Sequence, residues 1–525
     1  MKKYDHDIIE LLDRLITNRS DSSTKYEKAF EAVILEEIGK IDYFKENPSL
    51  FGTYEIEEDS LGRSVVWALA NHKMKKTVIL FGHHDVVNLS PTCEIDGLDS
   101  ESAKQYLKEN MRLNDDVFDG EWLFGRGCCD MKAGLAINLD QLKKATEKNP
   151  NVNVLFLSVP DEETESIGMR KAINLLKKLS EAFELDYVLA VLPEPHQRKE
   201  LNQFVVSTGS VGKMMPVIVT RGMPTHSGSA YCGLNSISIT IEIVKAIELN
   251  TEMGDMLNKR MTPPPTFLKM FSIKESYDVT TPEFTVAYFN WLFLKDNLER
   301  KLEQLRELCK WSMEDAINQF NYSYNEYLRK QSLPSYCECM NFDFEILLYQ
   351  ELAQKIEEKF EMDSLYHDFK EAYSHLANDE FSIKWITYLI DLLKPDHPMV
   401  VIGLLPPFYP VVDSSAFFEA HLSGPIQHHL KTNGMEMKHD PYFMGISDMS
   451  YMKKMHHDPS GVLLQMPEYQ KRYRIDLDNL DIEVLHVGPW GEDLHQKTER
   501  VFIKDVIETV PDLYELILET VSQIE

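Results

Sequence analysis

The stretch from Val78 to Asp85 constrains the fold of this chain more than any other. It reads Val-Ile-Leu-Phe-Gly-His-His-Asp, a short apolar run that ends in a glycine. Such a run, bounded by a turn residue, is typical of a buried strand in an α/β sheet. Because alternate residues of an extended chain point to one side, His83 and Asp85 leave the strand end together. The pair suits a metal ligand with its orienting carboxylate, but it also suits a strand that merely ends in polar residues.

Further acidic side chains are expected at the same edge of the sheet. They follow a Gly-rich turn and two more buried apolar runs, and they are Asp130, Glu162, Glu163 and Glu194. Each acid alone also fits a helix cap or a favourable charge at a helix N-terminus. Helix caps do not explain why the whole set converges with His83. The sequence therefore predicts a cluster of carboxylates and imidazole at this edge.

Length, charge and cysteine usage restrict the class of protein. A chain of 525 residues has room for two or more domains. The formal net charge of −30 argues against nucleic acid or an anionic membrane as a partner, because both require a basic face. We find neither an apolar leader after Met1 nor a run that approaches the roughly 18 apolar residues of a membrane span. Seven cysteines, few and odd in number, predict reduced thiols in a cytoplasmic protein.

The texture of the sequence changes after Ser207. A strand, a Gly/Pro-rich turn around His226, a helix, another strand and a long amphipathic helix follow in order. This strand–helix–strand–helix pattern predicts a separate small α+β domain. We therefore expect a larger α/β domain formed by residues 1–207 and 343–525, with residues 208–342 inserted into it.

The motifs and their order resemble a known family. They are Gly-His83-x-Asp85, Gly-Arg-Gly-x-x-Asp130-Met-Lys, Asp-Glu162-Glu163, Glu194-Pro and Gly-Pro…His495. In this order they resemble the metal-site motifs of the aminoacylase/carboxypeptidase-G/succinyl-diaminopimelate desuccinylase metallopeptidase family. The match covers nearly the whole chain, and six separated positions in order argue against chance. The chain length and the long region after Asn290 resemble the RocB-type arginine-utilisation proteins.

The resemblance implies both a fold and a metal site. The fold is a zinc-aminopeptidase-like catalytic domain, a mixed sheet flanked by helices, with the inserted domain as a lid or dimerisation domain. The site holds two divalent ions, usually zinc, with cobalt or manganese as alternatives. Asp130 would bridge the ions, and the peptide bond that follows it would be cis. His83 with Glu194 would complete one site, and Glu163 with His495 the other. Imidazole and carboxylate ligands without cysteine suit catalytic zinc.

Three residues are given catalytic roles by the same resemblance. Glu162 would be the general base that takes a proton from water and passes it to the leaving amine. Asp85 would orient His83. His226 would stabilise the oxyanion when the site closes, because lid closure commonly completes a catalytic constellation. A turn histidine without a task is the alternative for His226.

The substrate-binding positions depart in part from the family pattern. Asn235 matches the small-domain turn of the family, and Asp448 matches a substrate-side loop. Asp278 stands near a position where members often carry Asn, and Asn290 where an Arg often grips a substrate carboxylate. Both departures remove positive character. If Asp278 faces the site, it would favour a cationic substrate such as an arginine-bearing amide. An Asp278 on the outer surface is the alternative.

These observations lead to one main hypothesis and one alternative. The main hypothesis is a dinuclear zinc metallopeptidase or amidohydrolase that cleaves a peptide or N-acyl bond of a small amino-acid derivative, in arginine or amino-acid catabolism. The alternative is a catalytically silent relative that binds an amino-acid-like ligand in a regulatory or scaffolding role. Loss of Glu162 or of a ligand would favour the alternative, and neither is lost. We expect no nucleic-acid or membrane partner, and the family allows a homodimer.

Overall fold

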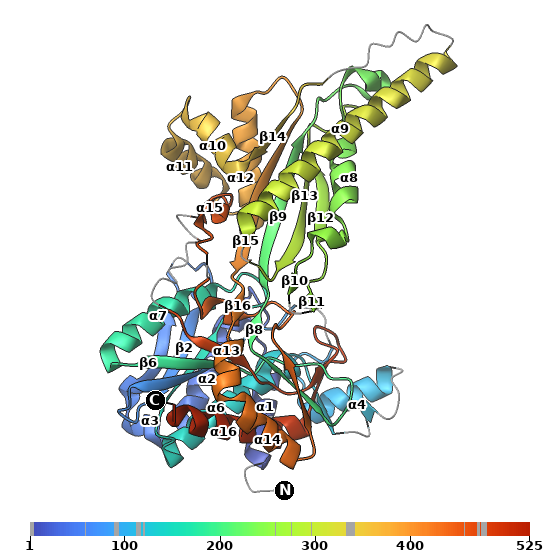
Figure 1. Cartoon of the computed structure of the whole chain (residues 1–525). Helices are drawn as coiled ribbons and strands as arrows, with labels where there is room; N and C mark the ends of the chain where they lie inside the picture. Colours follow the sequence, from blue (N-terminus) through green and yellow to red (C-terminus); the bar gives the residue numbers. More distant parts are fainter. Residues whose placement is uncertain are drawn as a thin grey trace. The chain divides into compact units, whose positions relative to one another are not determined.

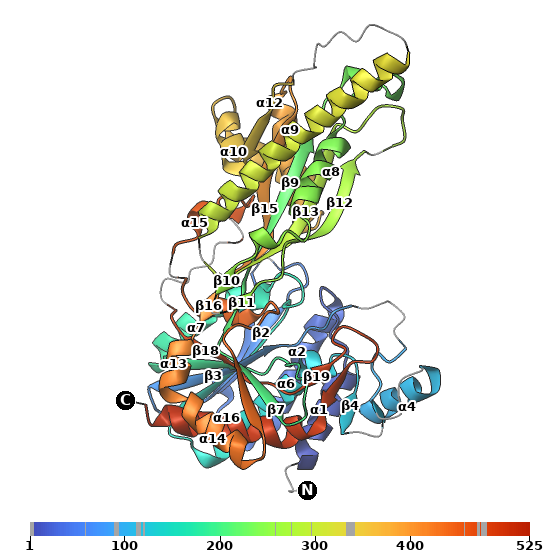
Figure 2. The same ribbon diagram turned by 45° about the vertical axis from the view of Figure 1, so that its right-hand side comes forward.

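The chain forms two compact units in the computed structural model. Unit 1 comprises Met1–Ser210, Val412–Lys454 and Ile475–Glu525, and unit 2 comprises Val211–Val411 and Met455–Arg474. Figures 1 and 2 show both units as ribbons coloured from the N-terminus (blue) to the C-terminus (red). The structure describes residues 5–57, 59–88, 94–111, 117–118, 121–257, 259–274, 276–295, 297–331, 342–455, 457–469, 473 and 480–524.

A mixed sheet of eight strands forms the centre of unit 1. In spatial order its strands are β1 (Phe51–Glu55), β2 (Ser64–Ala70), β5 (Asn153–Val159), β3 (Lys76–His83), β6 (Asp186–Leu192), β18 (Glu483–His486), β7 (Gln203–Ser207) and β17 (Glu436–Asp440). The strands β5, β3 and β6 run parallel, so their carboxyl ends lie at one edge. Residues Val78–Phe81 of β3 are fully buried, as expected for a strand covered on both faces. This edge receives the side chains predicted from the sequence.

Unit 1 also contains several α-helices. They are α1 (Asp5–Thr17), α2 (Lys25–Lys40), α3 (Asp42–Glu46), α4 (Ser100–Asn110), α6 (Ala133–Lys148), α7 (Ile167–Phe183), α13 (Ser415–His421), α14 (Ser423–Thr432) and α16 (Val510–Ser522). The helix α6 packs on β3 and β5, and α1 and α16 pack against α6. Short strands β4 (Trp122–Phe124), β20 (Arg500–Phe502) and β19 (Gly491–Glu492) form a small separate sheet. None of the helices in the described part of the chain has the length and apolar character needed to cross a bilayer.

Unit 2 is built on a second sheet. Its strands, in spatial order, are β12 (Thr266–Ile273), β13 (Phe284–Phe293), β9 (Gly212–Arg221), β15 (Met399–Tyr409) and β14 (Glu345–Leu348). Only β14 and β15 pair in parallel; the other neighbours are antiparallel. The α-helices of this unit are α8 (Ser236–Ile247), α9 (Leu298–Lys330), α10 (Tyr349–Glu357), α11 (Met362–Tyr373), α12 (Asn378–Leu393) and the short α15 (Ser460–Leu463). The helices α8 and α9 lie side by side in both views.

Both faces of the unit 2 sheet are buried. Ile218 of β9 belongs to the apolar cluster formed with α8 and α9. Its neighbours Val217 and Val219 belong to a second cluster, formed with α10, α11 and α12. Because successive side chains of a strand point to opposite faces, the two helical layers cover opposite faces of the same sheet. Trp385 of α12 is 2% exposed and lies in the second cluster.

Unit 2 is therefore longer than the inserted domain that the sequence predicts. The prediction returned the chain to the larger domain at residue 343, but β14, α10, α11, α12 and β15 extend the sheet of unit 2 or pack on it. The run Met399–Leu405 is apolar at every position except one glycine, which is typical of any strand with two buried faces. Such a run does not indicate which sheet it joins. The predicted fold class, an α/β unit with a mixed sheet and a second α+β unit, is confirmed.

Trp385→Ala tests the assignment of α12 to unit 2. Removing a buried tryptophan leaves a cavity that costs about 3–5 kcal/mol. We expect faster amide hydrogen exchange in β9 and β15 and unchanged exchange in β3 and β5. Trp311 of α9 is 56% exposed, so Trp311→Ala is the matched control and should change little. Faster exchange in β3 and β5 alone would contradict the assignment.

Candidate metal centre

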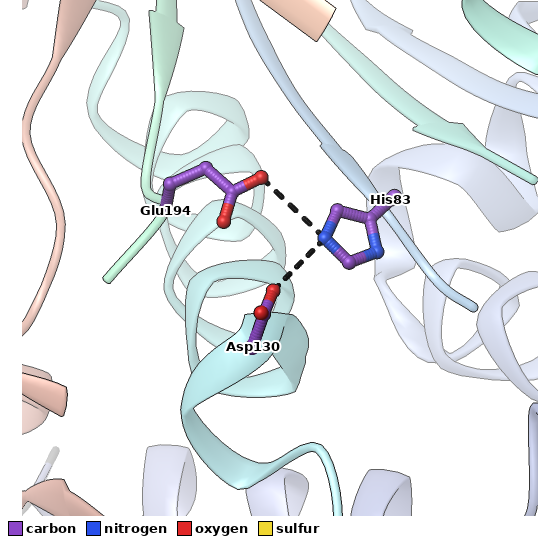
Figure 3. Close-up of side chains that lie close together, drawn as sticks. All are labelled: His83, Asp130 and Glu194. Carbon is purple, nitrogen blue, oxygen red and sulfur yellow. Dashed lines mark hydrogen bonds and ion pairs between the residues drawn. The ribbon is translucent and has the colours of Figure 1, made fainter. Parts of the chain in front are cut away.

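The first group of ligand-type side chains gathers around His83 at the end of β3. The Nε2 atom of His83 lies 3.2 Å from Asp130 Oδ1 and 3.4 Å from Glu194 Oε1. Figure 3 shows both carboxylates directed at this one ring nitrogen. All three residues are buried. Glu194 follows β6, the parallel neighbour of β3, so the sheet itself brings it to His83.

The second group shares Asp130 with the first. The Nε2 atom of His495 lies 2.9 Å from Asp130 Oδ2 and 3.3 Å from Glu163 Oε1. In each group, ligand atoms from all three residues lie within 4.8 Å of one another. The two oxygens of Asp130 thus face different histidines. One carboxylate with this orientation can bind to two cations at once.

A buried acid holds the backbone that carries Asp130. Glu499 accepts hydrogen bonds from the backbone N–H groups of Gly127, Cys129 and Asp130 at 3.0, 3.0 and 3.1 Å. It also accepts from Arg126 Nη1 at 3.0 Å. Gly127 adopts a left-handed conformation with φ +65°, which glycine tolerates. Glu499 therefore fixes the turn from which the shared carboxylate projects.

Met131 packs closely behind the first group. Its peptide bond with Asp130 is cis, as the family resemblance predicted. The Sδ atom of Met131 accepts a hydrogen bond from the backbone N–H of His83 at 3.3 Å. A Cβ atom at Gly82 would lie 2.6 Å from Met131 Cε, so a larger residue before His83 would displace the end of the Met131 side chain.

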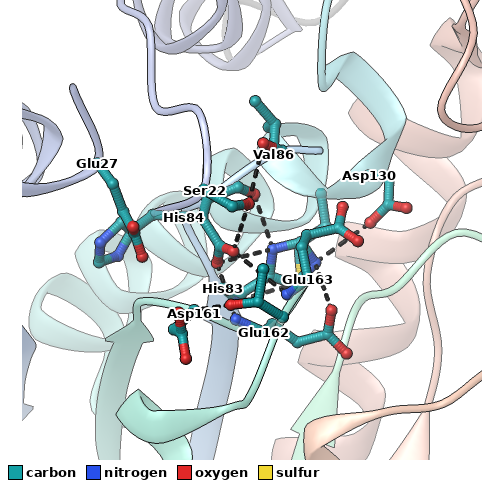
Figure 4. A network of polar contacts seen from close by, with 12 residues as sticks. Ser22, Glu27, His83, His84, Val86, Asp130, Asp161, Glu162 and Glu163 are labelled. Atoms are coloured by element: carbon teal, nitrogen blue, oxygen red, sulfur yellow. Dashed lines mark hydrogen bonds and ion pairs between the residues drawn. The ribbon is translucent and has the colours of Figure 1, made fainter. Parts of the chain in front are cut away.

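The carboxylate of Asp85 holds the segment with Glu162 and Glu163. It accepts hydrogen bonds from their backbone N–H groups at 3.1 and 3.2 Å, and from Ser22 Oγ at 2.8 Å (Figure 4). The Nδ1 atom of His83 lies 2.9 Å from the backbone oxygen of Asp85 and 3.6 Å from its Oδ1. Asp85 thus contacts His83 mainly through its carbonyl group. Its carboxylate instead binds the backbone N–H groups of Glu162 and Glu163, a role that the sequence did not suggest.

Burial and neighbouring charges shift the pKa values of these groups in opposite directions. Burial, reinforced by the Asp130 charge, raises the pKa of Glu163 to about 7. Burial also holds the pKa of Glu162 well above its usual value. Hydrogen bonds with Asp130 and Glu163 raise the pKa of His495 to about 10. Burial alone would raise the pKa of Asp130, but hydrogen bonds with His495 and His83 outweigh it and lower that pKa.

These side chains fit a pair of divalent metal ions. The donor set is imidazole nitrogen and carboxylate oxygen, which suits zinc and related ions. Glu163 Oε1 is buried, and its contact with His495 Nε2, at 3.3 Å, is poorly aligned as a hydrogen bond. A buried carboxylate oxygen without a well-aligned donor is costly unless a cation satisfies it. Asp130, His83 and Glu194 would hold one ion, and Asp130, Glu163 and His495 the other.

Two predicted site residues lie in turns of unit 2. His226 is exposed, and its Nδ1 accepts a hydrogen bond from the backbone N–H of Gly228 at 3.0 Å. Asn235 caps α8 by accepting from the backbone N–H of Ile237 at 3.0 Å. Asn235 also lines a cavity of about 370 Å³ between α8 and α9. The hydrogen bond to Ile237 shows that the Asn235 side chain already stabilises the N-terminus of α8.

The remaining two predicted residues differ in their surroundings. Asp278 is exposed, and its Oδ1 accepts from Lys274 Nζ at 2.7 Å and from the backbone N–H of Thr280 at 2.6 Å. Asp448 of unit 1 is only 1% exposed. Burial raises the pKa of Asp448 to about 7, against a hydrogen bond with Ser166 that lowers it. Asp448 is thus a buried acid of the same unit as the metal-ligand groups.

Several residues that organise the centre were not found from the sequence. Ser22, Arg63 and Glu499 contact the metal-ligand segments only through long-range folding, and none of the three stands in a motif quoted above. Asp161 is part of the motif Asp-Glu162-Glu163, yet its contact with a guanidinium 98 positions away could not be read from the sequence. The sequence shows these residues only as ordinary polar or charged positions, because their burial and their partners become visible in the structure alone.

Comparison with known proteins identifies the family. A model of the peptidase family M20/M25/M40 matches residues 79–488. The uncharacterized protein YqjN of Bacillus subtilis (strain 168) is 29% identical over 528 residues, which cover 97% of this chain and 95% of that protein. Protein RocB of the same strain is 24% identical over 523 residues, which cover 93% and 90%.

A solved structure shows a related fold. The YxeP protein of Bacillus subtilis, described as a dinuclear metal-binding peptidase of the M20 family, aligns with a TM-score of 0.52 and 9% identity. That alignment covers 99% of this chain and 100% of YxeP. At this identity the likeness concerns the fold alone. The match to the family model spans most of the chain, including the metal-ligand groups up to Glu194. This chain belongs to the peptidase family M20/M25/M40.

Proposed function

We propose that this protein is a dinuclear metal-dependent hydrolase that cleaves an amide bond in a small amino-acid derivative or short peptide. The observation that carries the proposal is Asp130, whose two oxygens lie 3.2 Å from His83 Nε2 and 2.9 Å from His495 Nε2. Family membership supports hydrolysis, and the structurally similar YxeP is described as a dinuclear metal-binding peptidase. Zinc is the metal that the donor set favours.

Glu162 is the proposed general base. Two bound divalent ions would polarise the scissile carbonyl and lower the pKa of water toward ~7. The Oε2 atom of Glu162 lies 4.0 Å from His83 Nε2, beside the first ligand group. From there it can take a proton from water and deliver it to the leaving amine. Burial holds the pKa of Glu162 well above its usual value, which makes its carboxylate a stronger proton acceptor than an ordinary Glu.

His226 is proposed to donate a hydrogen bond to the substrate oxygen. Because Gly228 donates to its Nδ1, the neutral ring carries its proton on Nε2. That N–H is the donor an oxyanion needs. This role is a prediction from the family resemblance, and the hydrogen bond from Gly228 supports the required tautomer.

Asp278 does not support a preference for cationic substrates. The charge hypothesis needs a free carboxylate, whereas Lys274 and Thr280 already bind this one in an exposed turn. The proposed substrate class is therefore an amide of an amino acid, without a chosen side-chain charge. A role in arginine utilisation rests on similarity to RocB alone.

Purified protein should be assayed with N-acyl amino acids and dipeptides, including arginine-bearing and neutral members. We expect release of free amine that chelators abolish and added zinc, cobalt or manganese restores. Ligand binding without any amine release would instead support the catalytically silent alternative. Metal analysis of the same samples separates a lost metal from an unsuitable substrate.

The roles of the adjacent acids Glu162 and Glu163 can be separated by substitution. Glu162→Gln should leave metal content nearly unchanged and lower kcat by about 10²–10⁴-fold, because a general base is lost. Glu163→Gln should weaken metal retention, because it removes an anionic ligand. Metal titration and steady-state kinetics measure both effects. Equal behaviour of the two variants would refute this division of roles.

His226→Ala should lower kcat while the metal content stays at the wild-type level. The described metal-ligand groups contain no residue of unit 2, so the loss of this side chain removes a hydrogen-bond donor only. His226→Gln, which keeps an N–H donor, should retain more activity than His226→Ala. Loss of bound metal in His226→Ala would show that His226 is a ligand.

A further inference from the structure

We propose that Arg63 is a positioning residue that sets the backbone of Glu162 and Glu163 through Asp161. Arg63 directly precedes β2 and is only 7% exposed. The proposal rests on the proposed function for the roles of Glu162 and Glu163. The placement of their backbone by Arg63 can be measured without any assay of activity.

The first link is the contact between Arg63 and Asp161. Arg63 Nη1 lies 2.6 Å from Asp161 Oδ1. The same oxygen accepts from Thr164 Oγ1 at 2.6 Å, and Oδ2 accepts from the backbone N–H of Ile167 at 3.2 Å. The backbone oxygen of Asp161 accepts from the N–H of Ser166 at 2.6 Å. One residue thus closes the whole turn that contains both acids.

The conformation of this turn requires such support. Asp161 has φ +73° and Ser166 has φ +50°, so side-chain-bearing residues adopt left-handed conformations at both of its ends. A residue in this region costs on the order of 1–3 kcal/mol and persists where its surroundings enforce it. Gly168 packs against Pro160, and a Cβ there would lie 2.4 Å from the Pro160 backbone oxygen. The turn is tightly wound, and the charge of Arg63 stabilises its first residue.

The second link joins Arg63 to the segment beside Asp85. Arg63 Nη1 also binds Glu27 at 3.1 and 3.0 Å, and Glu27 accepts from the backbone N–H of Ser23 at 2.8 Å. The adjacent Ser22 donates to Asp85, which binds the N–H groups of Glu162 and Glu163. Figure 4 shows Ser22, Glu27 and Asp161 around these acids. Arg63 therefore contacts the turn directly at Asp161 and is connected to Asp85 only indirectly, through Glu27 and the Ser22–Ser23 segment.

A lysine cannot reproduce these contacts. Arg63 also binds Asp59, through Nε at 3.1 and 3.2 Å and Nη2 at 2.8 Å. The planar guanidinium thereby binds three separate carboxylates with fixed geometry, whereas an ammonium group is a single point charge. Arg63→Lys keeps the charge and loses the geometry. It is the main test variant, because Arg63→Met would leave three buried acids without a cation.

Hydrogen exchange tests the placement directly. In metal-free protein, Arg63→Lys should speed exchange in a peptide that covers residues 160–167 and leave α8 of unit 2 unchanged. Lys301 of unit 2 is a matched control, because it is buried and binds Asp255 at 2.8 Å. Lys301→Met should speed exchange in unit 2 and spare residues 160–167. Unchanged exchange at 160–167 in Arg63→Lys would overturn the proposal.

A double-mutant cycle tests the route through Asp161. Asn tolerates the left-handed conformation, so Asp161→Asn removes the charge while keeping the backbone compatible. At saturating metal, each single variant should lower kcat on the order of 10²-fold, the effect of a small misplacement, with little change in KM. The double variant should lose no more of its kcat than the less active of the two single variants. Additive losses would show that Arg63 does not act through Asp161, and would overturn this route.

The two proposals fail in distinguishable ways. If the wild-type protein releases no amine from any substrate, the proposed function fails, and the exchange experiment still decides whether Arg63 places the turn. If the wild-type protein is active and Arg63→Lys matches it in kcat and in exchange, the positioning role fails alone. Faster exchange at residues 160–167 together with a lower kcat in Arg63→Lys is the confirming result.

Discussion

The accumulation of buried carboxylates at one edge of a parallel sheet is the constraint on which this structure depends. Asp85, Asp130, Glu162, Glu163 and Glu194 all lie beyond the carboxyl ends of β3, β5 and β6 or beside them. Burial of a carboxylate without a partner is costly, so each must be protonated or matched by donors and cations. The fold matches some of them internally. The rest would be stabilised by protonation or by bound metal ions.

The internal matching differs from one acid to the next. Backbone N–H groups and Ser22 surround Asp85, which needs no further cation. Asp130 divides its oxygens between His83 and His495. Glu163 keeps a buried oxygen whose contact with His495 Nε2, at 3.3 Å, is poorly aligned as a hydrogen bond. The carboxylates thus range from Asp85, whose oxygens accept several hydrogen bonds, to Glu163, which lacks a well-aligned one at Oε1. Bound metal ions would be most stabilising beside the carboxylates with the fewest hydrogen bonds. This arrangement also explains why Glu499 and Arg63 are buried nearby, since each holds a backbone segment that carries ligands.

The sequence predicted which acidic and imidazole side chains gather at the centre far better than it predicted the residues that hold them in place. His83, Glu163 and Glu194 follow apolar runs, so their approach at one sheet edge follows from strand geometry. The contacts of Glu499 with the Asp130 turn and of Arg63 with Asp161 join segments 369 and 98 positions apart. No local pattern encodes such pairs. The sequence left open whether Asp278 faces the site or the outer surface for a related reason, because it does not show that Lys274 binds its carboxylate.

The predicted boundary of unit 2 differs from the observed one because the sequence of an apolar strand does not indicate which sheet the strand joins. Met399–Leu405 could join either sheet, and only packing of β15 against β9 decides it. The helical region before it carries no chemical motif, but Trp385 and its neighbours cover the second face of the unit 2 sheet. Hydrophobic periodicity thus predicted elements and fold class, while the assignment of elements to units depended on long-range packing.

Anomalous X-ray scattering from crystals soaked in zinc tests the central claim most directly. The account predicts two peaks in unit 1, one on each side of the Asp130 carboxylate, with His83 and Glu194 at one and Glu163 and His495 at the other. In Asp130→Ala crystals both peaks should weaken together, because both ions share this ligand. No peak at this centre, or a single peak that Asp130→Ala leaves unchanged, would contradict a shared dinuclear site.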